Sequence, residues 1–139
     1  MIKTKRKPVV LIPADLKQMG DHPFHVAGHK YLIAVAEAAG ALPLVVPAIS
    51  DLIEIDDLLA IADGVLLTGA VSNVHPSHFG QEVHNPKLPL DPARDALTLQ
   101  LVQAAIKAEV PVLAICRGFQ EINLSDYGKT GIIGNSELP

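Results

Sequence analysis

Residues 110–123 read Val-Pro-Val-Leu-Ala-Ile-Cys-Arg-Gly-Phe-Gln-Glu-Ile-Asn. An apolar run ends at the only cysteine of the sequence, Cys116, and the residues after it favour a helix. Ala114 and Gly118 flank that cysteine two positions away on each side. A strand, a sharp turn that carries a nucleophile and then a helix form a nucleophile elbow, which needs small neighbours because the turn brings backbone segments close together. The stretch therefore predicts a buried strand that presents Cys116 at its carboxyl end.

Three further apolar runs have the same character as the run before Cys116. They span residues 8–13, 42–47 and 64–69. Each is continuously apolar rather than alternating, which indicates strands buried on both faces of a parallel sheet. Helices are expected between the strands, at residues 30–39, 51–62 and 91–108. This alternation predicts a doubly wound, mainly parallel α/β sheet with helices on both faces.

The expected helices carry end signals. Gly40 is a suitable stop for the first helix, and Ser50 is a plausible N-cap for the second. Asp91 can cap the third helix, in which Pro92 suits the first turn. Residues 15–29 and 70–90 lack such signals, and we expect them to be long loops. Both loops follow strands, and ligands of such sheets bind beyond the carboxyl ends of the strands, so the chemistry is expected there and at Cys116.

Composition narrows the class of protein. The sequence has 139 residues, of which 49% are hydrophobic and 19% charged, so we expect one domain that can bury a core. A net charge of −4 does not favour nucleic acid as a partner. A single cysteine excludes a disulfide within the chain and favours a reducing compartment, and apolar runs too short to span a bilayer predict no membrane segment. We therefore expect a cytoplasmic protein.

The polar residues of the sequence allow other interpretations. Cys116 alone could be a buried structural cysteine at the end of a core strand. His22, His25 and His29, or His75 and His78, could suggest a metal site, but exposed loop histidines explain them more simply, and we expect no metal and no cofactor. A phosphoacceptor domain would need an acidic cluster after the first strand, where Asp15 is the only acid.

Several segments resemble one known family. The elbow at 110–123 resembles that of class I glutamine amidotransferase-like hydrolases, and residues 63–76, Asp-Gly-Val-Leu-Leu-Thr-Gly-Ala-Val-Ser-Asn-Val-His-Pro, resemble the oxyanion strand of the γ-glutamyl-γ-aminobutyrate hydrolase branch. Shorter matches are His22-Pro-Phe-His25, Lys30-Tyr31, Ala38-Ala-Gly40 and Leu42-Pro-Leu44. The resemblance implies a flavodoxin-like fold. It assigns residues 1–123 to the N-terminal part of such a domain and leaves 124–139 as an atypical tail.

The resemblance also implies roles for individual residues. Cys116 matches the nucleophile that attacks a γ-glutamyl amide, a small-molecule substrate, and forms a thioester. The backbone N–H groups of Gly69 or Ala70 and of Arg117 match the oxyanion hole. Asn73, His75 and Gln120 match positions that border the substrate. Ala70-Val71 departs from the Ser-Pro expected after this glycine.

A larger departure concerns the catalytic base. The family activates its cysteine with a downstream histidine and an acid two residues later, whereas all six histidines here precede Cys116. We therefore expect a truncated domain with an uncovered sheet edge and a possible homo-oligomer. Two hypotheses stay open: a hydrolase of polyamine-derived γ-glutamyl compounds, or a catalytically incompetent remnant that at most binds a ligand or partner.

Overall fold

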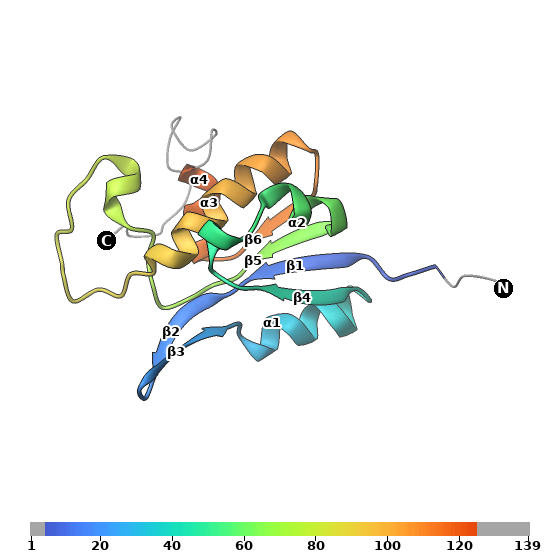
Figure 1. Ribbon diagram of the computed structural model, residues 1–139, viewed down its shortest axis with the longest axis horizontal. Helices are drawn as coiled ribbons and strands as arrows, with labels where there is room; N and C mark the ends of the chain where they lie inside the picture. The colour runs from blue at the N-terminus through green and yellow to red at the C-terminus, as the bar shows by residue number, and fades with distance from the viewer. Residues whose placement is uncertain (1–4, 125–139) are drawn as a thin grey trace.

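A four-stranded parallel sheet forms the centre of the computed structural model, which describes residues 5–124 (Figure 1). Its strands are β1 (Val9–Pro13), β4 (Leu42–Val46), β5 (Gly64–Leu67) and β6 (Val112–Ala114). They lie in the order β4-β1-β5-β6, and every neighbouring pair is parallel. Each strand falls within one of the four predicted apolar runs, which confirms the parallel sheet.

Helices cover both faces of the sheet (Figure 1). On one face lies α1 (His29–Ile33), which continues as a π-helical turn over Ala34–Ala38. On the other face lie α2 (Ile55–Ile61), α3 (Pro92–Lys107) and α4 (Arg117–Leu124). Successive strand residues serve opposite faces, since Leu67 packs in the cluster of the α3 side while Leu66 packs in that of the α1 side. The fold is the flavodoxin-like α/β sandwich that the sequence predicts.

Two of the three predicted helix ends are confirmed. The Asp91 carboxylate accepts a hydrogen bond of 3.0 Å from the Arg94 N–H and caps α3. Gly40 follows the first helix with φ of +61°. The N-cap prediction for Ser50 is wrong, because Ser50 begins a short 3₁₀ turn (Ser50–Leu52) and α2 starts only after Glu54. The β-branched Ile53 is extended between the two and interrupts the helix.

The loop expected at residues 15–29 is instead largely a β-hairpin. β2 (Asp15–Met19) pairs antiparallel with β3 (His22–Val26), and the hairpin projects from the end of β1 (Figure 1). Gly20, with φ of +61°, supplies the turn. Its strands mix polar and apolar residues without regular alternation, and β3 contains Pro23, so no strand signal was visible in the sequence.

The second long loop agrees with its prediction. Between β5 and α3 the chain is mostly irregular, with a short 3₁₀ helix over Pro76–Phe79 and one isolated bridge between Asn73 and Leu90. No helix among residues 5–124 is long and apolar enough to cross a membrane.

The sheet leaves an apolar strip open at the β6 edge. Leu113 of β6 is paired in register with Leu66 of β5, so both side chains face the α1 side. Leu66 is buried there, but Leu113 is 63% exposed and Ile115 is 37% exposed. α1 therefore covers the inner strands and leaves the β6 edge uncovered within the described part of the chain.

Candidate active site

Cys116 lies at a tight turn between β6 and α4. Its φ of +53° is in the left-handed region, which residues other than glycine seldom adopt. The turn is closed by hydrogen bonds from Gly118 N–H to the Ile115 carbonyl and from Phe119 N–H to the Cys116 carbonyl, each 2.9 Å long. The cysteine is exposed, so it is not the buried structural cysteine of the alternative interpretation. The strand–turn–helix geometry predicted for residues 110–123 is confirmed.

Gly118 allows α4 to approach the sheet closely. A Cβ added at this position would lie 2.5 Å from the Leu67 carbonyl oxygen, closer than van der Waals contact permits. Gly118, the small residue that the elbow pattern requires, thus lets the first turn of α4 pack directly on β5.

The resemblance assigns the oxyanion hole to the backbone N–H group of Gly69 or Ala70 together with that of Arg117. Within residues 5–124 the N–H groups of Arg117 and Ala70 have no hydrogen-bond acceptor. The N–H of Gly69 donates to the Tyr31 hydroxyl over 3.1 Å. Gly69, Ala70 and Cys116 line one pocket, so two of the predicted donor residues share a cavity with the thiol.

That pocket has a volume of about 870 Å³ and opens at the carboxyl ends of the strands. Its walls are contributed by the β2–β3 hairpin, the start of α1, the chain after β5, the chain before α3, and Cys116. Two cationic side chains, Lys17 and Lys30, are among the lining residues. No histidine of the described chain lines it.

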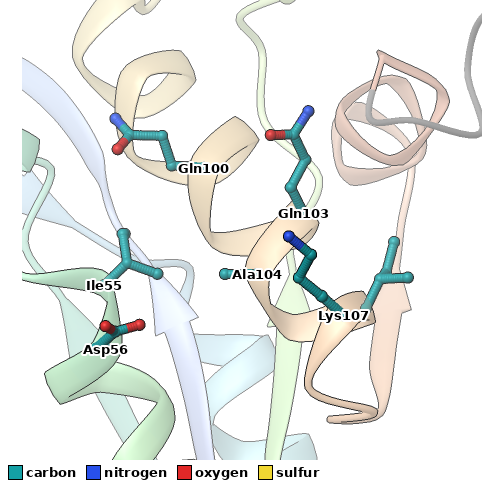
Figure 2. Close-up of a pocket in the computed structure, with 7 residues that line it drawn as sticks. Ile55, Asp56, Gln100, Gln103, Ala104 and Lys107 are labelled. Atoms are coloured by element: carbon teal, nitrogen blue, oxygen red, sulfur yellow. The ribbon is translucent and has the colours of Figure 1, made fainter.

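A second hollow lies between α2 and α3 (Figure 2). It has a volume of about 670 Å³ and is lined by Ile55, Asp56, Gln100, Gln103, Ala104, Ile106 and Lys107. Ile55 and Asp56 belong to the first turn of α2, and the other five residues belong to the carboxyl-terminal half of α3, which leads back to the amino end of β6. The hollow contains no nucleophile and lies away from the strand ends where Cys116 is exposed.

A buried ionic cluster joins α3 to α4, the helix that follows Cys116. We use the name for Arg94, Arg117, Asp95 and Glu121, whose side chains are all fully buried, together with the partly exposed Asp15. Arg94 binds Glu121 over 2.8 Å and Asp15 over 2.7 Å, and it donates to the Thr68 carbonyl over 2.6 Å. It therefore ties α3 to α4, to β2 and to the end of β5.

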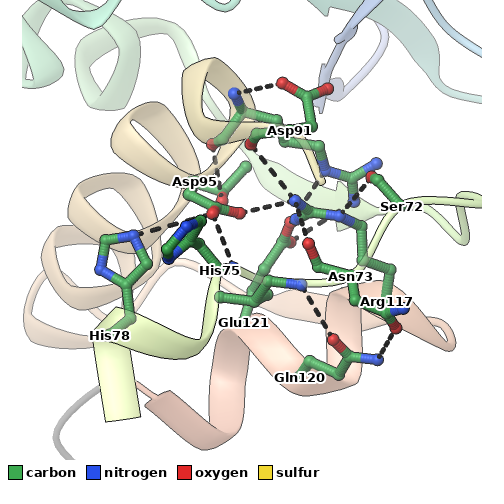
Figure 3. Close-up of polar contacts among 12 residues, drawn as sticks. Ser72, Asn73, His75, His78, Asp91, Asp95, Arg117, Gln120 and Glu121 are labelled. Atoms are coloured by element: carbon green, nitrogen blue, oxygen red, sulfur yellow. Dashed lines mark hydrogen bonds and ion pairs between the residues drawn. The ribbon is translucent and has the colours of Figure 1, made fainter. Parts of the chain in front are cut away.

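Arg117, the residue after the nucleophile, is the second cation of the cluster (Figure 3). It binds Asp95 of α3 over 2.5 Å and Glu121 of its own helix, and its Nε donates to the Ser72 hydroxyl over 2.9 Å. The side chain of Arg117 thus points away from Cys116 into the protein. Of Arg117, only the backbone N–H then remains as a free donor next to Cys116 in the described chain.

The charges of the cluster depend on each other. Burial would lower the pKa of Arg94, but the carboxylates of Glu121 and Asp15 outweigh burial and raise it. Burial raises the pKa of Glu121, and the guanidinium groups of Arg94 and Arg117 oppose this effect. Each buried charge is therefore tolerated only while its partner is present.

The residues predicted to border the substrate bind other protein groups instead (Figure 3). The Gln120 side chain is buried; it accepts from Val74 N–H over 3.1 Å and donates to Asn73 over 3.0 Å. His75 donates its backbone N–H to Asp95 over 2.9 Å, and its ring contacts Ser77. Asn73, His75 and Gln120 are not among the residues that line the Cys116 pocket, and their substrate roles stay predictions.

Sequence reasoning missed Tyr31 and the ionic cluster. A signal for the cluster existed in α3, where Asp91, Arg94, Asp95 and Thr98 precede Leu101 and Val102 at helical spacing. These polar residues lie on the buried side of the helix. Charged residues that continue an apolar stripe point to a buried ionic network.

Comparisons with known proteins agree with this geometry. The γ-glutamyl-γ-aminobutyrate hydrolase PuuD of Escherichia coli K12 is 34% identical over 122 residues, which cover 87% of this chain and 47% of PuuD. The corresponding hydrolase of Shigella flexneri is 33% identical over the same shares, and the glutamine amidotransferase-like protein RP404 of Rickettsia prowazekii is 28% identical over 89% of this chain and 45% of its own. The chain thus spans about half the length of these relatives. The family model of Peptidase C26 matches residues 8–131, and we conclude that the chain belongs to the Peptidase C26 family of class I glutamine amidotransferase-like proteins.

Proposed function

We propose that Cys116 is the nucleophile of a γ-glutamyl amide hydrolase. The observation that carries this proposal is the strained, exposed cysteine at φ of +53°, between a parallel strand and a helix N-terminus. Such strain is retained where the surrounding structure enforces it, and active sites are a common place for it. The free N–H of Arg117 and the adjoining pocket give an acyl group a place to bind.

The reaction consists of two acyl transfers. The Cys116 sulfur attacks the amide carbon, the C–S bond forms and the carbonyl electrons move onto oxygen, where backbone N–H groups stabilise the charge. The C–N bond then breaks, and the amine leaves with a proton that balances the one lost by the thiol. Water next adds to the thioester, and the C–S bond breaks to release glutamate and the free thiol.

The charges of the pocket favour an acidic substrate. Lys17 and Lys30 line the pocket, whereas the two lining carboxylates are already engaged: Asp15 binds Arg94, and Asp91 caps α3 and accepts from Leu16 N–H. The γ-glutamyl group carries a carboxylate, and so does the γ-aminobutyrate named for the relatives. We place the substrate among γ-glutamyl compounds of this acidic type, within polyamine catabolism and in the cytoplasm.

A second candidate function is binding without turnover. It is favoured by one observation: no histidine among residues 5–124 lines the Cys116 pocket, so no base for proton delivery is at hand there. The predicted tail lies almost entirely outside the described residues and adds nothing to this point. The chain on its own is therefore expected to turn over slowly or not at all.

Release of p-nitroaniline from γ-glutamyl-p-nitroanilide distinguishes the two functions. The hydrolase proposal expects slow release by the wild-type protein that Cys116→Ala abolishes. Equal, background release by both proteins, together with calorimetric binding of γ-glutamyl-γ-aminobutyrate, would support binding alone. His75→Ala tests the predicted substrate role of His75, which requires a higher KM.

A further inference from the structure

Tyr31 lines the same pocket as Cys116, although the two residues are far apart in sequence. It belongs to α1, and its half-buried ring packs against the backbone of Gly28, where an added Cβ would lie 3.0 Å from the ring. Its hydroxyl accepts a hydrogen bond of 3.1 Å from the N–H of Gly69. The Tyr31 ring thus packs against Gly28, and a hydrogen bond from the backbone of Gly69 positions its hydroxyl.

The hydroxyl of Tyr31 and the nucleophile lie on the same side of Gly69. A Cβ added at Gly69 would lie 2.7 Å from the Tyr31 oxygen and 3.5 Å from the Cβ of Cys116. Tyr31, Gly69 and Cys116 also line the same pocket. An acyl group on the sulfur therefore has the phenol beside it.

The direction of this hydrogen bond determines what the phenol can do. Because its oxygen accepts from Gly69, its own proton is available to a second acceptor, and no acceptor for it occurs among residues 5–124. The Gly69 N–H already donates to Tyr31, so it cannot also donate to a ligand directly. The Tyr31 hydroxyl is the group that can donate to a ligand at this position. Donation from the amide also polarises the O–H bond and makes it a better donor.

We propose that Tyr31 is a catalytic residue whose hydroxyl donates a hydrogen bond to the oxyanion formed when Cys116 attacks a carbonyl, in place of the Gly69 N–H. The proposal rests on acyl transfer at Cys116 as the proposed function. When the C–S bond forms, the carbonyl π electrons move to oxygen, and Tyr31 and the Arg117 N–H donate to it. No proton is transferred from Tyr31; when the carbonyl reforms, the hydrogen bond weakens again.

The test compares two reactions of the same thiol. Acylation by p-nitrophenyl acetate passes through an oxyanion and releases a leaving group that needs no proton, whereas alkylation by iodoacetamide forms no oxyanion. Tyr31→Phe should slow acylation by about tenfold to a hundredfold, the scale of a lost oxyanion donor, and leave alkylation within about twofold. Cys116→Ala gives the background of both reactions. An equal loss in both rates, or no change in either, would overturn the role of Tyr31.

A further measurement keeps the proposal falsifiable if Tyr31→Phe does not fold. The acylation-to-alkylation ratio of the wild-type protein should exceed that of N-acetylcysteine by at least about tenfold, and equal ratios would overturn the proposal. Both reactions are independent of the γ-glutamyl group, so failure of γ-glutamyl-p-nitroanilide turnover contradicts the proposed function and leaves this test intact.

Discussion

Cys116 is a single residue that the fold holds in an unfavourable backbone conformation. Only Cys116 and Glu109 among the described non-glycine residues have a positive φ, at +53° and +58°. Glu109 follows α3 at a position where glycine is usual, whereas Cys116 turns its side chain out of the strand and into the pocket. An L-residue in this conformation costs about 1–2 kcal/mol relative to glycine.

Replacing Cys116 by glycine should therefore stabilise the protein. We expect the free energy of unfolding of Cys116→Gly to exceed that of Cys116→Ala by about 1 kcal/mol, after the entropy cost of glycine is subtracted. Glu109→Gly, at a site without a proposed catalytic role, is the matched control and should give a similar gain. Urea unfolding followed by circular dichroism measures both. A Cys116→Gly variant no more stable than Cys116→Ala would mean that the elbow is unstrained.

Only part of the site at this scale could be predicted. Cys116, Ala114 and Gly118 are adjacent in sequence, so the elbow was visible as a pattern. The contact between Tyr31 and Gly69 joins residues 38 positions apart, and it depends on how α1 docks on the sheet. No local pattern encodes that docking.

At the scale of elements, the ionic cluster joins α3 to α4 and holds the helix that begins at the elbow. Glu121 accepts from both arginines, so each guanidinium compensates part of the same buried carboxylate. Removing one cation leaves the other charges buried without full compensation.

Arg117→Met should lower the free energy of unfolding by about 3–5 kcal/mol, the usual cost of breaking a buried pair. Arg6→Met is the matched control, since it removes an exposed pair with Asp63 that solvent screens, and its effect on the free energy of unfolding should be much smaller. Chemical denaturation of both variants provides the comparison. Equal losses in the two variants would contradict the structural role of the cluster.

Secondary-structure elements could be predicted from the sequence only where local signals encode them. The four strands and α3 were visible because apolar runs and helix caps are local signals. The β2–β3 hairpin was not, because its strands mix polar and apolar residues without alternation and tertiary contacts hold it, such as the bond from Ala48 N–H to the His25 ring.

At the scale of the whole molecule, the open β6 edge suggests association between copies of the chain. Leu113 is 63% exposed on a strand whose outer side has no neighbour in the described sheet. Unpaired strand edges with exposed apolar residues favour pairing with another chain.

Light scattering after size exclusion should therefore show a dimer or larger species of the wild-type protein. Leu113→Lys should shift it toward monomer, because a charge at the edge opposes strand pairing. Leu52→Lys is the control, since Leu52 is 81% exposed on a 3₁₀ turn away from this edge. A clean monomer whose cooperative melting does not depend on concentration would show that the sheet needs no partner.

The central claim is that Cys116 accepts a γ-glutamyl group, and intact-protein mass spectrometry after incubation with γ-glutamyl-p-nitroanilide tests it most directly. No histidine of the described chain lines the pocket, so the adduct should form slowly. Its hydrolysis, which needs a base to activate water, should be slower still, so the adduct should accumulate over a long incubation. We predict a single γ-glutamyl adduct that maps to Cys116, is released by hydroxylamine and is absent from Cys116→Ala. An unmodified wild-type protein, or an adduct that persists in Cys116→Ala, would contradict the account.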